Sequence, residues 1–205
     1  EFCQSVLASG AMLFTNFENT LTDSQSVFTV EDERKSKPVE YGEFPDDLTM
    51  IEGAFAKAEE LMSKTGSNRS QVLVTSLCDD VLKALREYAQ NNNKPVTYLE
   101  RRGDFVRVKQ AEKAGHLVLG HADFVGGLEF NVVVIVGVDK GRVPHEGETV
   151  DSNSRSFASY SAHNRLYVAS SRARYALSVL GVKSRGPSVL LDGATANKLI
   201  EGTLS

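Results

Sequence analysis

The amino-acid sequence predicts an α/β fold with a largely parallel sheet and helices on both faces of that sheet. Strand-like segments alternate with amphipathic helical segments along most of the 205 residues, and this alternation is typical of parallel strands joined by helices. One segment, residues 131–138, is apolar on both faces, as expected for a strand in the middle of a parallel sheet. The chain is 41% hydrophobic, which at this length is enough for one domain with a core.

The N-terminal segment, residues 1–45, has the least regular pattern. Apolar or alternating runs predict short strands at residues 11–15, 26–30 and 39–44. We expect these to be peripheral strands of the same domain, whose main part is residues 46–205.

A helix is predicted directly after Pro45. Either Asp46 or Asp47 supplies its N-terminal cap, and Gly66 ends it. The apolar residues of this helix are spaced by three and four and form one stripe, made of Leu48, Ile51, Phe55, Ala58 and Met62.

The remaining elements continue the alternation. Helices are predicted over residues 81–88 and over about residues 157–172, the second preceded by a polar loop, residues 139–156. Strands are predicted at residues 71–76, 96–99, 116–119, 131–138 and 175–180.

Charge, cysteine content and hydropathy exclude several classes of protein. The net charge of −4 argues against a free-standing basic DNA-binding module, although a motor domain can bind nucleic acid through a local groove. Cys3 and Cys78 are not part of any zinc-binding pattern, and we expect no metal site. Two scattered thiols favour a reducing compartment, so we expect a cytoplasmic protein. No apolar run approaches the ~18 residues of a membrane helix, so no membrane partner is expected.

Two segments carry side chains suited to nucleotide chemistry. Residues 126–130, GGLEF, lead directly into the apolar strand, and residues 164–174, NRLYVASSRAR, lead from a helix into a strand. Glycines at 126 and 127 permit positive φ and a close approach of the backbone to a ligand. The guanidinium of Arg172 is a planar fork that matches phosphate oxygens and stays charged. The alternative is that the glycines only shape a turn, and that Arg172 complements a helix C-terminus on the surface.

Together the two segments resemble motifs V and VI of UvrD/Rep/PcrA-like superfamily 1 helicases. In that family the first motif reads roughly TxHxxKGLEF before an apolar strand, and the second reads roughly RLxYVAxTRA. The family often has GxFP between them, and this chain has GRVP at residues 141–144. The resemblance covers about residues 116–182. It implies a RecA-like (P-loop NTPase-like) fold and the C-terminal, or 2A, motor domain of a helicase.

The resemblance also implies roles for individual residues. Gly127 and Glu129 would bind ATP, with the Glu129 carboxylate accepting hydrogen bonds from the ribose. Arg172 would be both an ATP-binding and a catalytic residue, an arginine finger that stabilises charge on the γ-phosphoryl group. Because both residues flank parallel strands, we expect them at the same sheet edge, and ligands of such sheets collect at the carboxyl ends of the strands. Arg165 is expected to pair with a carboxylate, and residues 167–168 to pack in the core.

Three positions of the first motif depart from the family at its nucleic-acid-binding residues. His121 stands at the threonine position, Asp123 at the histidine position and Gly126 at the lysine position. The family residues there follow single-stranded DNA, so the resemblance assigns nucleic-acid contact to these three positions. Glycine removes a phosphate contact and Asp123 adds repulsion. His121 could compensate from two residues away, but a lone histidine at a strand end more often has a structural role.

The sequence lacks the phosphate loop GxxxxGK[ST], so we expect no ATP cradle or Mg²⁺ site in this chain. The chain starts without methionine, and we interpret it as a fragment of a longer parent protein. ATP and Mg²⁺ would then be held by an N-terminal motor domain of that parent, and the fragment alone would be inactive. The expected ligand is single-stranded DNA, with RNA as the other candidate.

Two other functions compete with an ATP-dependent helicase or translocase. A degenerate helicase domain could serve as a scaffold that binds nucleic acid or protein, as the altered motif V suggests. An unrelated Rossmann-like enzyme would need GxGxxG between a strand and a helix, which the chain lacks. Because Glu129 and Arg172 are both retained, the motor is favoured.

Overall fold

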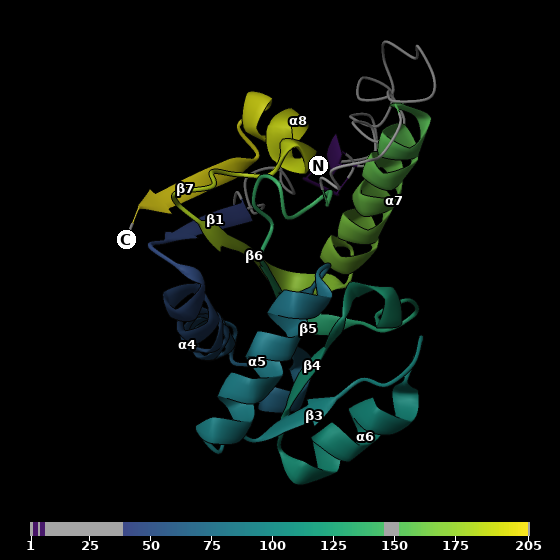
Figure 1. Cartoon of the computed structure of the whole chain (residues 1–205). Coiled ribbons are helices and arrows are strands. Elements are labelled where there is room, and N and C mark those ends of the chain that lie inside the picture. The colour runs from purple at the N-terminus through teal and green to yellow at the C-terminus, as the bar shows by residue number, and fades with distance from the viewer. Residues whose placement is uncertain (1, 4, 7–38, 146–151, 205) are drawn as a thin grey trace, which may run out of the picture.

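A computed structural model describes residues 2, 3, 5, 6, 39–145 and 152–204 (Figure 1). The strands predicted at residues 11–15 and 26–30 lie outside this part of the chain.

The described residues form a seven-stranded sheet in the order β3-β4-β2-β5-β6-β1-β7, and every pairing is parallel. Figure 1 shows this sheet running from β3 at the bottom of the view to β7 at the upper left. The strands are β1 (Val39–Phe44), β2 (Val72–Ser76), β3 (Val96–Tyr98), β4 (Leu117–His121), β5 (Phe130–Val136), β6 (Ala173–Val182) and β7 (Ile200–Leu204). The predicted parallel α/β fold is confirmed.

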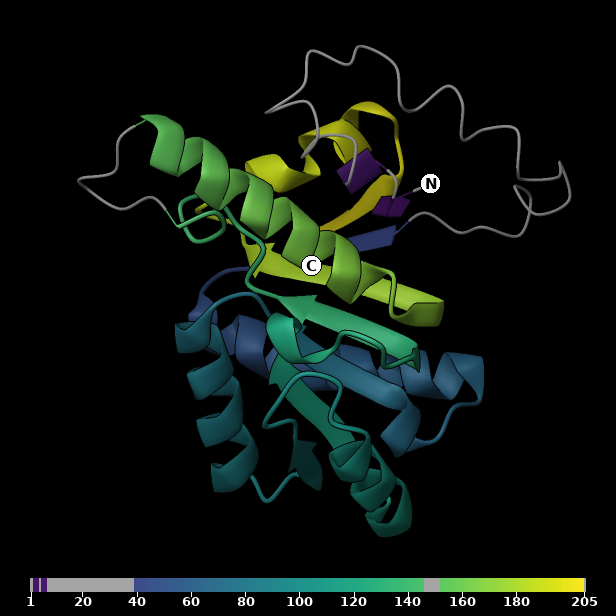
Figure 2. The ribbon, with the colours of Figure 1, turned by 90° about the vertical axis from the view of Figure 1, so that its right-hand side faces the viewer.

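Helices pack on both faces of the sheet. On one face lie α4 (Asp47–Thr65) and α5 (Asp79–Asn91), whose apolar residues share one core cluster with the sheet. On the other face lie α6 (Phe105–Ala114), α7 (Ser152–Ser170) and the short α8 (Asp192–Ala196). Figure 2 shows α7 running along its face of the sheet, with α4 behind the strands. Single 3-10 turns, η2 (Arg69–Gln71), η3 (Ala122–Phe124) and η4 (Val189–Leu191), lie between these elements.

Strand β5 contributes to both cores, as the sequence predicts. Val133 and Ile135 are fully buried against α7 and its neighbours, whereas Val132, Val134 and Val136 are fully buried on the α4 side. A strand with apolar residues on both faces is stable only between two layers of helix. The position of β5 near the centre of the sheet therefore follows from its composition.

The ends of α4 are formed by the residues that the sequence indicates. The Asp46 carboxylate accepts from Thr49 N at 2.8 Å, and Thr49 Oγ1 accepts from Asp46 N at 3.3 Å. These reciprocal bonds satisfy main-chain donors at the helix start. Gly66 has φ 64° and ends the helix in the left-handed conformation.

Three features of the fold were not predicted. Helix α6 lies between β3 and β4, where no helix was expected, and α8 and β7 follow β6. Helix α7 begins at Ser152, about a turn before the predicted start, and ends at Ser170, so that β6 already begins at Ala173. No helix among the described residues is long and apolar enough to span a membrane.

Candidate functional site

The motif V segment, residues 121–130, runs from one edge of the sheet back to the other. His121 ends β4 and pairs with Ser76, which in turn pairs with Val136 at the carboxyl end of β5. Phe130 begins β5 and pairs with Ala173 at the amino end of β6. The segment therefore connects the carboxyl edge of the sheet to its amino edge.

At the amino edge, Arg172 joins the two predicted motifs. Its Nη1 donates to the carbonyl of Leu128 at 3.3 Å, its Nε donates to Val168 O at 3.0 Å, and its Nη2 donates to Ser171 Oγ at 2.9 Å. The main chain adds a fourth bond, because Phe130 N donates to Arg172 O at 2.9 Å. The half-buried guanidinium thus fixes the end of α7 against the loop that precedes β5.

Gly127 and Glu129 flank the carbonyl that Arg172 binds, and both are exposed. Gly127 has φ 81°, a conformation that favours glycine, and no atom lies within 4 Å of the position that a Cβ would take there. The backbone at Gly127 and the Glu129 side chain are therefore open to a ligand beside the half-buried Arg172.

The expectation that Glu129 and Arg172 share one sheet edge is confirmed. The expectation that this is the carboxyl edge is wrong, because they share the amino edge. Both residues precede parallel strands, at the amino ends of β5 and β6. The reason is topological, since a helix or loop that crosses back over a parallel sheet delivers the chain to the start of the next strand.

At the carboxyl edge, His121 caps the 3-10 turn that follows β4. Its Nδ1 accepts from Asp123 N at 3.2 Å and lies 3.3 Å from Asp123 Oδ2. Because a main-chain N–H can only donate, Nδ1 is the acceptor in the bond from Asp123 N. The ring is only 9% exposed and packs edge-on against Phe124. His121 therefore has a structural role in this conformation.

Asp123 is paired rather than free. Its Oδ1 lies 2.9 Å from Nε of Arg165, which projects from α7, and both side chains are almost half exposed. The predicted pairing of Arg165 with a carboxylate is confirmed, and Asp123 is its partner. The packing of Tyr167 and Val168 against the core is confirmed as well. With its charge offset by Arg165, Asp123 repels a nearby phosphate less than a lone carboxylate would.

Because Gly126 has no side chain, an arginine from a neighbouring loop can lie close to it, a contact that the sequence did not predict. A Cβ at Gly126 would lie 3.0 Å from Nε of Arg102, a residue of the loop between β3 and α6. The same loop is bonded to the motif V segment, since Gly103 N donates to Phe124 O at 2.9 Å. The one signal for this neighbour in the sequence is the basic pair at residues 101–102.

A pocket of about 850 Å³ opens at the carboxyl edge, between the N-termini of α4 and α5, residues 141–145 and α7. Its lining includes Cys78, Arg142, Phe157 and Arg165. Burial raises the pKa of the Cys78 thiol to about 11, so the thiol stays protonated at neutral pH.

Beneath this pocket lies a buried carboxylate. Asp139 is fully buried, accepts from Val182 N at 3.1 Å, and lies 3.4 Å from Nε of Arg142. Arg142 also contacts Asp47 at 2.6 Å, so the pair connects β6 with the start of α4. Burial raises the pKa of the Asp139 carboxyl, against the opposing effects of the hydrogen bond from Val182 N and of the nearby Arg142 and Arg185. Among the described residues, no three His, Cys, Asp or Glu side chains gather as metal ligands.

Comparisons with known proteins identify the fold. No protein-family model and no curated protein matches the sequence. The structure is similar to the C-terminal domain of a possible DNA helicase from Lactobacillus plantarum WCFS1, with a TM-score of 0.58, 15% identity, and 92% of this chain and 99% of that chain covered. It also matches the helicase domain of Pyrococcus furiosus Hef (TM-score 0.42, 12% identity, 73% and 27% covered) and S. tokodaii Xpd4 (TM-score 0.42, 13% identity, 82% and 39% covered). The chain therefore has a RecA-like fold of the kind found in helicase C-terminal domains.

Proposed function

We propose that this chain is the C-terminal motor domain of an ATP-dependent DNA helicase or translocase of the UvrD-like superfamily 1 type. Glu129 binds the ribose of ATP, and Arg172 contacts the γ-phosphate of an ATP molecule that a second motor domain of the same parent protein holds. The observation that carries the proposal is the hydrogen bond from Arg172 Nη1 to the Leu128 carbonyl. It brings the guanidinium beside the exposed stretch of Gly127 and Glu129.

The geometry of Arg172 suits a charge-stabilising role. A guanidinium has five N–H donors, and three of them are bound to protein acceptors. One N–H on Nη1 and one on Nη2 remain for phosphate oxygens. Because the side chain is already oriented, little ordering is needed when charge develops on the transferred phosphoryl group. Mg²⁺, bound with ATP in the other domain, would neutralise charge on the β- and γ-phosphates.

The motif V segment directly connects the amino edge of the sheet, where we place the nucleotide, with the carboxyl edge, where we place the nucleic acid. Asp123, at the carboxyl edge, is paired with Arg165 of α7, and the same helix ends next to Arg172 at the amino edge. A displacement of this segment by bound nucleic acid would therefore reach the Leu128 carbonyl, and through it the guanidinium.

The competing proposal is a degenerate helicase domain that acts as a binding scaffold. It is favoured by the inward orientation of Arg172, whose bonds to Val168 and Leu128 also explain the residue as a helix-end clamp. The two proposals differ in whether the guanidinium contributes to ATP turnover.

Steady-state ATPase assays of the full-length protein, with and without single-stranded DNA, separate the two proposals. Arg172→Ala is expected to lower kcat by about 10³–10⁵-fold while ATP binding changes little. Arg172→Lys should rescue poorly, because a point charge does not reproduce the fork. The 205-residue chain alone should show no ATPase activity, since it lacks a phosphate loop.

Arg174→Ala is the matched control, because Arg174 is exposed, stacks on Tyr175 and carries the same charge. It should keep wild-type turnover. Thermal unfolding of each variant checks that lost activity is not lost structure. If Arg172→Ala is folded and turns over ATP like the control, the scaffold proposal takes the place of the motor.

A further inference from the structure

A basic loop between β3 and α6 lies directly against the motif V segment. Arg102 of this loop approaches Gly126 so closely that a Cβ at Gly126 would be 3.0 Å from Arg102 Nε and 3.6 Å from Nη2. Across the same contact, a Cβ at Gly103 would lie 3.3 Å from Gly126 O. The absence of side chains at Gly103 and Gly126 allows the two loops to meet.

Arg102 differs from its basic neighbours in its partners. Arg101 lies 3.8 Å from the Asp104 carboxylate, and Arg107 pairs with Glu100. Arg102 is exposed and forms no ion pair within the part of the chain that the structure describes. Its charge is therefore available to an anion from outside the protein.

The loop that carries Arg102 is firmly held. Asp104 is only 3% exposed and its carboxylate accepts from Glu100 N at 3.1 Å and from Arg107 N at 3.4 Å. Together with the bond from Gly103 N to Phe124 O, these contacts fix both ends of the short loop. The main chain at Arg102 thus has a defined position relative to Gly126.

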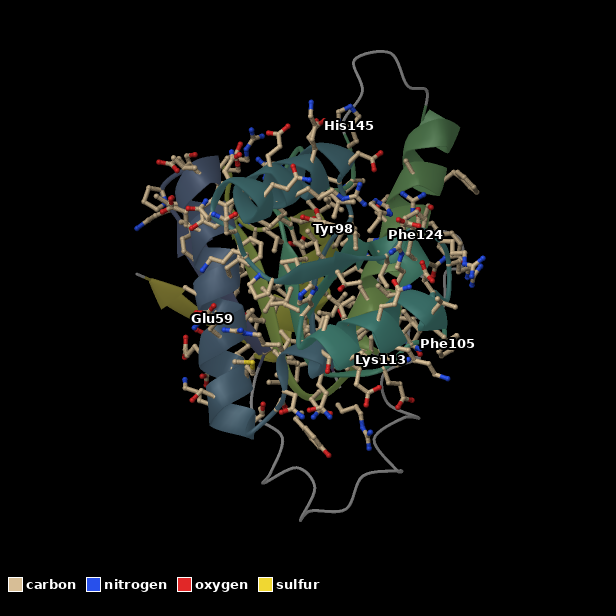
Figure 3. The ribbon with its side chains drawn as sticks, turned by 90° about the horizontal axis from the view of Figure 1, so that it is seen from below. Glu59, Tyr98, Phe105, Lys113, Phe124 and His145 are labelled. Atoms are coloured by element: carbon tan, nitrogen blue, oxygen red, sulfur yellow. The ribbon has the colours of Figure 1, made fainter. Side chains whose placement is uncertain are left out.

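An exposed aromatic ring stands next to Gly103, the residue that follows Arg102 in the same loop. Phe105, the first residue of α6, is 57% exposed, and its Cε2 would lie 3.8 Å from a Cβ at Gly103. In the view of Figure 3, Phe105 and Phe124 lie on the side of the molecule opposite Glu59. A free guanidinium beside an exposed aromatic ring is the combination that single-stranded nucleic acids bind, through the phosphate and the base face respectively.

We propose that Arg102 and Phe105 form a contact site for single-stranded nucleic acid, with Arg102 on a backbone phosphate and Phe105 stacked on a base. Arg102 then provides, from a neighbouring loop, the positive charge that Gly126 lacks within motif V. The inference rests on the proposed function only in its choice of ligand. A patch that is both apolar and basic could instead bind a protein surface. The experiment below distinguishes that partner from nucleic acid.

The test is equilibrium binding of a fluorescent oligothymidylate to the full-length protein without nucleotide, over a series of salt concentrations. Arg102→Ala should weaken binding and reduce the slope of log K against log salt by about 0.7, the value for one phosphate of a single strand. Lys113→Ala removes the same charge from the other end of α6 and should leave the slope unchanged. Phe105→Ala should weaken binding by about tenfold at every salt concentration, with the slope unchanged.

Moving the positive charge from residue 102 to residue 126 makes the test specific to this contact. Gly126→Lys alone should add less than one phosphate contact, because its side chain must displace the Arg102 guanidinium. Combined with Arg102→Ala, the same substitution should restore the wild-type slope. Two substitutions that act on one contact are expected to be non-additive in this way.

The proposal is overturned if Arg102→Ala and Phe105→Ala bind the oligothymidylate as Lys113→Ala does, or if the wild-type protein does not bind it. The patch would then face a protein partner instead. ATP turnover without DNA, and its dependence on Arg172, is measured separately, because Arg102 lies at the carboxyl side of β3 and β4. Failure of the nucleic-acid contact therefore leaves the ATPase test of the proposed function intact.

Discussion

At the scale of single residues, Arg172 shows how one side chain can hold two segments together and still be suited to the chemical role proposed for it. Two of its bonds satisfy main-chain carbonyls, one at the end of α7 and one before β5, where acceptors have no partner within a helix or sheet. Stabilising a helix end and presenting a fork to phosphate need the same planar group with several donors. The residue type was predictable from the sequence, but its main-chain partners were not, because any residue provides a carbonyl.

Glu129 allows a test of the proposed nucleotide site that does not disturb the fold, because its side chain is exposed. Glu129→Gln should raise the KM for ATP by about tenfold and change kcat little, since the ribose contact is the same in the ground and transition states. With 2′-deoxyATP, which lacks one hydroxyl of the diol, the wild type and the variant should differ less. The measurement is steady-state kinetics on both nucleotides, and an equal effect on both would argue against a ribose contact.

At the scale of elements, the helices and strands with regular apolar spacing were predicted, and those without it were not. Helix α4 has a continuous stripe and matching caps, so both its position and its end were predictable. Helix α6 was missed because Ala111 is its one fully buried residue, while Phe105 and Val106 at its start are exposed. Its polar cap at Asp104 and its end at Gly115 were the signals available.

The N-terminal cap of α6 supports both the helix and the loop that bears Arg102. Asp104→Ala should lower the free energy of unfolding by about 1–2 kcal/mol, because two main-chain donors lose their acceptor. Asp104→Asn keeps a capping oxygen and should lose much less. Urea denaturation of the two variants provides the comparison, and equal losses would show that the negative charge, rather than the cap, stabilises this region.

At the scale of the whole molecule, the parallel topology explains why the site was only partly predictable. The sequence singled out the two segments at residues 126–130 and 164–174, and the expectation of a common edge was correct. Which edge they share depends on the direction in which loops cross the sheet, and on the register of β5 with β6. The approach of Arg102 to Gly126 likewise depends on β3 lying next to β4, a neighbour relation that local patterns do not encode.

Asp139 is buried at the carboxyl edge of the sheet, and its ionisation should make the stability of the fold depend on pH. Burial raises its pKa above the ordinary value of 3.8, so the folded protein binds this proton more tightly than the unfolded chain does. The contribution of Asp139 to the free energy of unfolding is therefore largest below pH 3.8 and falls as pH rises through the raised pKa.

Asp139→Asn removes this titration. The difference in unfolding free energy between the wild type and Asp139→Asn should therefore change with pH over that window, with the wild type losing stability relative to the variant as pH increases. Chemical denaturation at several pH values gives this difference. A difference that is constant with pH would mean that the hydrogen bond from Val182 N and the nearby Arg142 and Arg185 cancel the effect of burial.

The acceptors around Arg172 also determine whether the contact between the two segments can be detected as covariation among homologous sequences. Two of the three acceptors are main-chain carbonyls, at residues 128 and 168, and the third is the hydroxyl of Ser171. Substitution at residues 128 or 168 changes a side chain but leaves the carbonyl in place. Correlated substitution between homologues would therefore detect residue 171 alone, and the connection between the two motifs would leave no covariation signal.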